Sequence, residues 1–563
     1  MDCKVNKNRL ITIINKLKNK KIVFSMCAIL SVFSIFVMIL VFSRYDFHSD
    51  CMGYLLQAKE QVKQHKWFPQ RFHYTTGIFG FSTSVYMMPF VNLIHNDYLL
   101  HEIGSIIALA VTVSLVWVLF WKKKHIASLI TLLVCFPGSY TYNDMMFFQS
   151  AYINVCTVIM LNLVAFKYLY DSITLENYKS SSFFSRRIVF ASILFFGVVY
   201  FTNYCGIQNY VYVVLPLLGA IVIVIWLKHG LDIKALFSER KYIFVILLMI
   251  IGVVAGKLTY DRIIVLVGFD TATNVQHGGI ISLNEIHDLF WVLFPRFLAD
   301  FGITSTTSLI SLSTVRVILG FVYFFFTVIG SHVYMIRHAE EYDEYNKVLI
   351  YFSALLNGAV LFIVFLGGER EDRYYFPAMF GAQINNALLI ENVTKRYKKQ
   401  FGYSLYLVVI FMVLSMHVDC YKAYINRDGA DFSIQNMVNP KVESELVNVL
   451  EEHDLQYGFA TFWRAYSHMV ASNSKIEIAA YDMGNPLMPY FFDGNNPEHP
   501  KYYACSEDLY NPELHPGRCF VLVADGEVIP DKFYQFCNEQ YVINGFTILV
   551  YDKNIHYIDE LVE

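Results

Sequence analysis

The first long apolar stretch of the chain indicates what kind of protein this is. Residues 22–42 read IVFSMCAILSVFSIFVMILVF and carry no charge, and SRYDFHSD follows at 43–50. A helix needs about 20 apolar residues to cross the roughly 30 Å of hydrocarbon in a bilayer. The stretch therefore predicts a membrane-spanning helix that ends at a loop with two carboxylates and a histidine, Asp46, Asp50 and His48.

The composition extends this prediction to most of the chain. Of the 563 residues, 56% are hydrophobic and only 16% are charged, which is too apolar for a water-soluble protein of this length. We expect a multi-spanning α-helical membrane protein with about eleven spans of roughly 20 residues each. The predicted spans are 22–42, 99–121, 126–142, 150–169, 188–204, 209–227, 242–258, 308–336, 347–366, 376–393 and 401–417.

Basic residues set the expected orientation. Residues 1–21 are rich in lysine and no small-x-small cleavage site follows the first span, so we expect an uncleaved helix with a cytoplasmic N-terminus. Basic clusters recur on the predicted inner side, among them Lys122-Lys123-Lys124, Arg186-Arg187 and Lys395-Arg396. The positive-inside rule therefore predicts a multi-pass plasma-membrane protein, with loops 43–98 and 259–307 and residues 418–563 outside the cell.

Residues 418–563 differ in composition from the transmembrane domain expected at 22–417. This part is polar and rich in turn residues, and short apolar runs alternate with helix-like segments. The pattern is typical of a small extracytoplasmic α/β domain. Its aromatic side chains, such as Trp463, Tyr466 and Tyr481, could stack on sugar rings, although most aromatic residues of such a domain belong to its core.

Acidic residues in long loops are concentrated on the predicted outer face, so an active site should lie there. Asp50 precedes a helical stretch, where a carboxylate is favoured, and Asp46 is closer to the end of the first span. Asp144 ends the run Tyr140-Thr141-Tyr142-Asn143-Asp144, which is suited to holding sugar hydroxyls or a divalent ion. Each of the three aspartates could instead be a helix cap or a solvated charge.

A charged stretch at 369–373 offers candidates for binding a phosphate. A guanidinium can bind a phosphate bidentately, and Arg373 is favoured over Arg370 because Tyr374, a second tyrosine and a proline follow it. These charges could also form only salt bridges with one another. Two further candidates have simpler interpretations as a connector and a surface residue: Gln208 could contact an acceptor, and His277, beside two glycines, could cover a lipid site.

These features together resemble the GT-C class of integral-membrane glycosyltransferases, over most of the chain. The resemblance rests on the cytoplasmic N-terminus, the first external loop with Asp46 and Asp50, a second external acid at Asp144, the motif Arg373-Tyr374-Tyr375-Phe376-Pro377, and a trailing domain. It implies that a polyprenyl-phosphate-linked sugar is the donor and that a cell-surface glycan or glycolipid is the acceptor. It also implies that Asp50 or Asp46 is the general base and that Arg373 binds the donor phosphate.

The chemistry of such a transfer sets further expectations. An inverting enzyme needs only one base, because a lipid phosphate leaves without help from an acid, so we expect transfer of a hexose or pentose with inversion. No cofactor is required by the sequence. If a magnesium or manganese ion is used, Asp50 and Asp144 would hold it; no two histidines have the spacing of metal ligands.

Other functions remain open at the level of sequence. A polyprenyl-linked glycan polymerase or ligase would use similar donors, and a flippase-type transporter would place ionisable residues at mid-membrane. A structural or sensory protein would leave Asp50, Asp144 and Arg373 dispersed, whereas an enzyme should gather them around one cavity. The net charge of −3 indicates no nucleic-acid partner, so the expected partners are the lipid-linked donor, the acceptor and membrane lipids.

Overall fold

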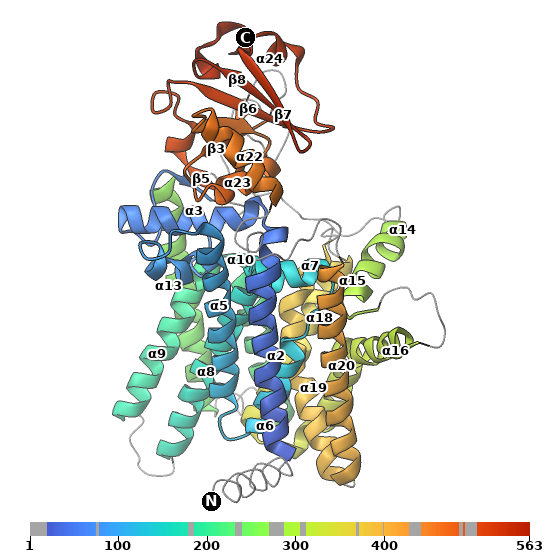
Figure 1. Cartoon of the computed structure of the whole chain (residues 1–563). Helices are drawn as coiled ribbons and strands as arrows, with labels where there is room; N and C mark the ends of the chain where they lie inside the picture. The colour runs from blue at the N-terminus through green and yellow to red at the C-terminus, as the bar shows by residue number, and fades with distance from the viewer. Residues whose placement is uncertain are drawn as a thin grey trace, which may run out of the picture.

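The protein is a helical bundle with a small sheet domain at one end. A computed structural model describes residues 20–74, 78–177, 185–230, 239–268, 286–303, 311–366, 371–397, 399–426, 441–482, 488–489 and 504–562. Figure 1 shows long helices running side by side and the C-terminal sheet stacked on one end of the bundle. We call this end, which also carries α3 (Ser49–Gln64), the domain end.

Eight helical segments in the described part of the chain are long and apolar enough to cross a membrane. This confirms the predicted class, a multi-spanning α-helical membrane protein. The eight segments lie within α2 with η1 (Lys20–Phe42 and Ser43–Asp46), α5 (Asp97–Leu119), α8 (Ala151–Asn177), η5 with α11 (Tyr210–Val214 and Leu215–His229), α13 (Arg240–Val267), α16 with η9 and α17 (Leu312–Phe325, Phe326–Gly330 and Ser331–Arg337), α18 (Glu344–Leu366) and α20 (Lys399–Ile425).

The remaining predicted spans correspond to α6 (Lys124–Val134), α9 (Arg186–Thr202) and α19 (Phe376–Arg396). The prediction of a span at 126–142 is wrong in its second half, because α6 has only 11 residues and ends before Pro137. Proline disfavours helical geometry in the residue before it. The chain then turns, and Ser139 caps the short helix α7 (Tyr140–Asn143) that leads to Asp144.

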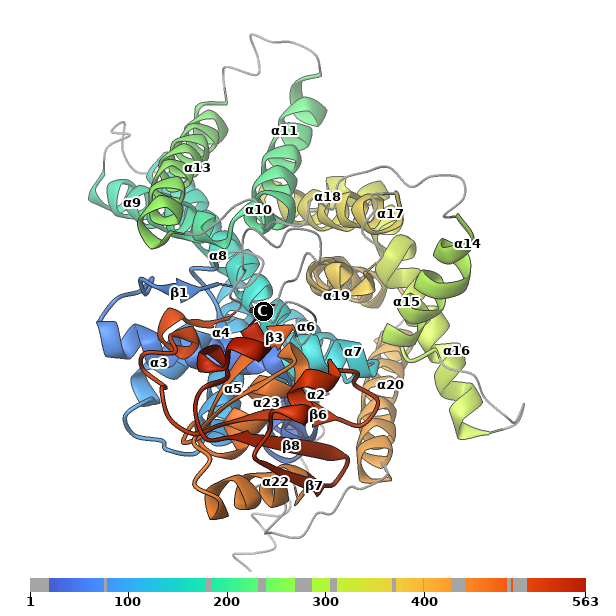
Figure 2. The same cartoon turned by 90° about the horizontal axis from the view of Figure 1, so that it is seen from above.

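Helix α19 is buried in the middle of the bundle although it carries several amides. Figure 2 shows it between α18, α17 and α6. Its Gln383 donates to the carbonyl of Met379 at 2.6 Å, Asn385 donates to the carbonyl of Ile350 at 3.1 Å, and Asn386 donates to Thr327 at 3.0 Å. Polar groups inside a membrane protein are tolerated when neighbouring helices supply partners. These bonds satisfy amide N–H groups of a polar helix at the centre of an apolar bundle.

Helix α3 lies across the domain end, between the bundle and the sheet (Figure 1). It begins after His48, whose ring nitrogen accepts from the backbone N–H of Asp50, and it ends at His65 in a left-handed conformation with φ 52°. The other connections in the described residues are short: η1 (Ser43–Asp46), α4 (Thr83–Met87), η2 (Met88–Phe90), η3 (Asp144–Phe148), η4 (Asn203–Cys205), α10 (Ile207–Asn209), α14 (Ile286–Asp288), η8 (Leu289–Leu293), α15 (Phe294–Asp300), η10 (Ala339–Glu341) and η11 (Asp372–Tyr375).

The C-terminal domain is built around a six-stranded sheet of order β4-β3-β2-β6-β8-β7. The pairs β2–β3 and β2–β6 are parallel, while β6–β8 and β8–β7 are antiparallel. The strands are β2 (Tyr457–Ala460), β3 (Glu477–Asp482), β4 (Met488–Pro489), β6 (Cys519–Ala524), β7 (Glu539–Ile543) and β8 (Phe546–Tyr551). The described helices are α22 (Lys441–Glu452), α23 (Phe462–Ala471), η12 (Glu507–Tyr510), α24 (Asp531–Gln535), η13 (Ile555–Tyr557) and α25 (Asp559–Val562). This confirms the expected α/β domain.

The core of this domain continues into the helix beneath it. Met52, Leu55 and Ala58, which lie three residues apart on α3, are fully buried in the same hydrophobic cluster as the sheet. Two further links join the parts: β1 (Phe72–His73) pairs with β5 (Cys505–Ser506), and Ser49 Oγ donates to the carbonyl of Phe462 at 2.5 Å. The domain is therefore packed firmly on α3.

A test of this docking uses Gly53 of α3. A Cβ at Gly53 would lie 2.8 Å from the Cβ of Ala504, so we expect Gly53→Val to push the 504–506 segment away from α3. Overpacking of this kind costs about 1–3 kcal/mol. We predict a lower Tm and faster proteolysis of the C-terminal domain. Gly358→Val is the matched control, since nothing lies within 4 Å of its Cβ position, and equal sensitivity of the two variants would contradict the docking.

Candidate active site

A buried ion pair fixes the loop that connects α2 to α3. Arg44 donates to both carboxylate oxygens of Glu102 on α5, from Nε at 2.5 Å and from Nη2 at 2.8 Å. The Glu102 side chain is 1% exposed and that of Arg44 is 10% exposed. Removing one partner of such a pair typically costs about 3–5 kcal/mol, because the other charge is left buried alone. The pair therefore anchors η1 and the residues that follow it at the domain end.

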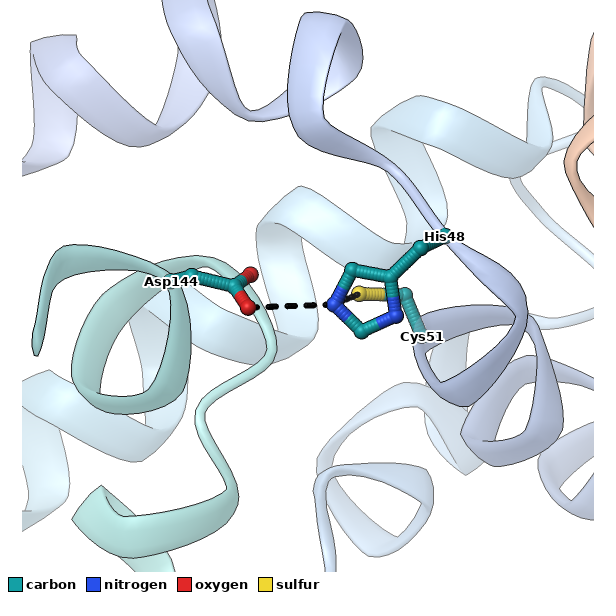
Figure 3. Close-up of side chains that lie close together, drawn as sticks. All are labelled: His48, Cys51 and Asp144. Carbon is teal, nitrogen blue, oxygen red and sulfur yellow. Dashed lines mark hydrogen bonds and ion pairs between the residues drawn. The ribbon is translucent and has the colours of Figure 1, made fainter. Parts of the chain in front are cut away.

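His48 lies at the centre of the candidate site (Figure 3). Its Nε2 is 3.1 Å from Oδ2 of Asp144, and the thiol of Cys51 is 3.9 Å from the same nitrogen. Burial alone would lower the pKa of His48, but Cys51 and Asp144 raise it well above its usual range. Burial raises the pKa of the Cys51 thiol. The ligand atoms of these three residues all lie within 4.8 Å of one another, so they could hold a metal ion.

Asp50 borders this cluster on its other side. Its Oδ2 is 4.0 Å from Nδ1 of His48, and its backbone N–H donates to that nitrogen at 3.3 Å. Burial raises the pKa of Asp50, while His48 and Arg373 oppose the rise. The carboxylate is therefore flanked by two basic groups and is 23% exposed, which leaves it accessible to a substrate.

Arg373 comes to the site from η11, more than 300 residues away in sequence. It interacts electrostatically with Asp50, its guanidinium carbon is 5.7 Å from the centre of the Tyr374 ring, and its Nε is 3.7 Å from Glu371. Nε is buried and makes no hydrogen bond to any described residue. An N–H group left without a hydrogen-bond partner on a guanidinium is suited to an anionic ligand.

The structure thus places three of the residues proposed from the sequence together: Asp50, Asp144 and Arg373. Tyr374 lies beside Arg373, and its carbonyl accepts from Tyr212 at 2.8 Å.

The other candidates are placed differently. Asp46 is buried in η1 and interacts with Cys420 and Tyr424 on α20. Gln208 is half-buried on α10, and its side chain makes no hydrogen bond to another described residue. Arg370 and His277 lie outside the described residues.

Sequence reasoning missed several residues of this site. His48 and Cys51, three residues apart at a helix start, form a His-x-x-Cys pair that could have been noticed. Asp300 had no such signal: it accepts a hydrogen bond from Ser139, and burial together with Asp372 raises its pKa well above the usual range. Asp300 thereby joins the loop before Asp144 to η11.

The C-terminal domain also contributes to the site. Trp463, at the start of α23, is 54% exposed, and its ring centre is 6.2 Å from that of His48. By contrast, Tyr466 and Tyr481 are at most 2% exposed and belong to the core of the domain. Of these three aromatic residues, only Trp463 could meet a ligand beside His48.

Comparison with solved structures identifies the fold. No protein-family model matches the chain, and no curated protein matches it in sequence. The crystal structure of ArnT from Cupriavidus metallidurans bound to undecaprenyl phosphate matches 94% of this chain and 97% of that one, with a TM-score of 0.50 and 8% identity. The chain has the GT-C fold. The predicted fold class is therefore confirmed; at this identity, the likeness concerns the fold and not the activity.

A second solved structure matches this protein less well. The Archaeoglobus fulgidus oligosaccharyltransferase, in its apo form, matches 89% of this chain and 69% of that one, with a TM-score of 0.48 and 13% identity.

Proposed function

We propose that the protein is a membrane glycosyltransferase that moves a hexose or pentose from a polyprenyl-phosphate donor to a cell-surface glycan or glycolipid. The observation that carries this proposal is that Asp50 and Asp144 both lie beside His48 at the domain end and that Asp50 also interacts electrostatically with Arg373. A glycosyl transfer needs a base for the acceptor hydroxyl and a cation for the leaving phosphate. These residues supply both within one cluster.

Arg373 is proposed to bind the donor phosphate. Its Nε has no hydrogen-bond partner in the described part of the chain, and Tyr374 packs beside the guanidinium. Hydrogen bonds from a guanidinium to phosphate are charge-assisted and can be bidentate. The phosphate gains negative charge as it leaves, so a fixed cation would stabilise the transition state more than the ground state. The ArnT structure with undecaprenyl phosphate bound supports a lipid phosphate as the ligand class.

Asp50 is the better candidate for the general base. A base is most effective when its pKa lies near the working pH, and burial raises the pKa of Asp50. Asp50 also interacts with Arg373, whereas Asp46 interacts with Cys420 and Tyr424 on α20. A single base with a phosphate leaving group corresponds to an inverting reaction.

Trp463 is proposed to contact the acceptor, and its chemistry favours a saccharide. An exposed indole offers a flat apolar face on which the C–H face of a sugar ring can stack. Trp463 reaches the His48 side of the site from the C-terminal domain, so that domain would position the acceptor near Asp50. We propose that this end of the bundle faces the outside of the cell, because the basic loops predicted from the sequence fall at the other end.

The role of Asp50 can be tested by complementation. In a strain that lacks the gene, we predict that Asp50→Asn lowers the rate of sugar transfer to surface glycan by about 10²–10⁴-fold, since the acceptor hydroxyl loses its base. Asp46→Asn is the matched control and should keep most of the activity. Rates would be measured in right-side-out membranes with equal amounts of each variant. Full activity of Asp50→Asn, or equal loss in both variants, would rule out the assignment.

The role of Trp463 can be tested by separating binding from chemistry. We predict that Trp463→Ala raises KM for the acceptor about 10-fold, as expected for the loss of 1–2 kcal/mol of aromatic contact, and leaves kcat nearly unchanged. Trp463→Phe should recover most of the affinity because it keeps a ring. Trp121, which is 69% exposed just after α5, provides the control Trp121→Ala. An unchanged KM in Trp463→Ala would exclude the stacking contact.

A further inference from the structure

His48, Cys51 and Asp144 form a cluster of three possible metal ligands. The cluster differs in chemistry from the pair of carboxylates that the sequence predicted for magnesium or manganese. Asp144 contributes an oxygen, His48 a nitrogen and Cys51 a sulfur. Magnesium takes oxygen ligands almost exclusively, while zinc and related late first-row metals accept imidazole and thiolate. The donor set therefore fits a zinc-class ion and does not fit magnesium.

The arrangement of the three groups also argues against a Cys-His-Asp relay. In such a relay the nucleophile and the acid contact opposite nitrogens of the histidine ring. Here the thiol of Cys51 and the carboxylate of Asp144 both approach Nε2, at 3.9 Å and 3.1 Å. Figure 3 shows Asp144 facing this nitrogen of the His48 ring and Cys51 behind the ring. Two donor groups next to one ring nitrogen are compatible with a metal site and not with a relay.

The distances are close to those of a metal site. In a tetrahedral zinc site with bonds of about 2.0–2.3 Å, neighbouring ligand atoms lie about 3.3–3.8 Å apart. The atoms of this cluster lie within 4.8 Å of one another, so small side-chain movements would complete the geometry. His48 and Cys51 are held three residues apart at the start of α3, on the same side of its first turn.

A second observation points to a missing ligand. Asp144 is 5% exposed, and its Oδ1 makes no hydrogen bond to any residue in the described ranges. A buried carboxylate oxygen without a partner is costly. A cation bound at this point would give that oxygen a partner. Metal binding through Nε2 places the ring proton of His48 on Nδ1, so the 3.3 Å bond from the backbone N–H of Asp50 would be lost when the cation binds.

We propose that His48, Cys51 and Asp144 form a binding site for one zinc-class divalent cation. A cation bound there would add positive charge to the site in which the leaving phosphate is proposed to gain negative charge. That role rests on the proposed transfer function, whereas the binding itself does not.

The test is a titration of the purified full-length protein in detergent, after chelation and dialysis, with Co²⁺ as the probe. We expect one equivalent to bind with a near-ultraviolet charge-transfer band from thiolate to cobalt. Zn²⁺ should displace the cobalt stoichiometrically, and millimolar Mg²⁺ should not. Cys51→Ser should lose the band. Cys27→Ser, at a partly buried cysteine of α2, is the matched control and should keep it.

Several results would overturn the site. These are the absence of a thiolate band in the wild type, a band that persists in Cys51→Ser, and equal loss in Cys27→Ser. Circular dichroism of each variant separates lost binding from lost folding, and Asp144→Asn gives a second variant that should bind weakly with its thiol intact. If the wild-type protein binds cobalt but shows no sugar transfer, the cation site is supported and only the proposed function is contradicted.

Discussion

Charged groups at the end of an apolar bundle need partners, and the contact between His48 and Asp144 is the one on which the site depends. It joins the start of α3 to the π-helical turn η3, two segments 96 residues apart in sequence. Asp50, Cys51 and Trp463 all lie close to His48. This contact brings the first loop against Asp144, so that Asp50 and Asp144 lie on either side of one imidazole ring.

Two other constraints hold that contact in place. The buried pair of Arg44 and Glu102 fixes the loop between α2 and α3 from the bundle side. From the other side, the C-terminal domain packs its hydrophobic core on α3 and bonds to Ser49 through the carbonyl of Phe462. The domain is therefore part of the support of the site, and Trp463 is the side chain by which it reaches into the site. A bundle with this domain removed would leave α3 with an exposed apolar face.

Most helices of the bundle could be predicted from the sequence, because each membrane span is a long run of apolar residues. The prediction failed at 126–142, where α6 ends early and a Pro-Gly turn follows. The turn signal Pro137-Gly138 lies inside the predicted span, and the apolar run before it outweighed that signal. Among site residues, Asp50, Asp144 and Arg373 could be proposed because charges are rare in such a chain. Asp300 could not, since its partners Ser139 and Asp372 are brought to it only by the fold. The sequence analysis did not single out Cys51, which the structure places beside His48.

The central claim is that Arg373 forms the anion site of this cluster, and binding of undecaprenyl phosphate to the purified protein tests it most directly. A charge-assisted hydrogen bond is worth about 1.5–3 kcal/mol, so Arg373→Gln should raise Kd by about 10- to 100-fold. Arg316→Gln is the control, because Arg316 is paired with Asp419 on α20; its Kd should stay near that of the wild type. An unchanged Kd in Arg373→Gln, or the same loss in both variants, would contradict the account.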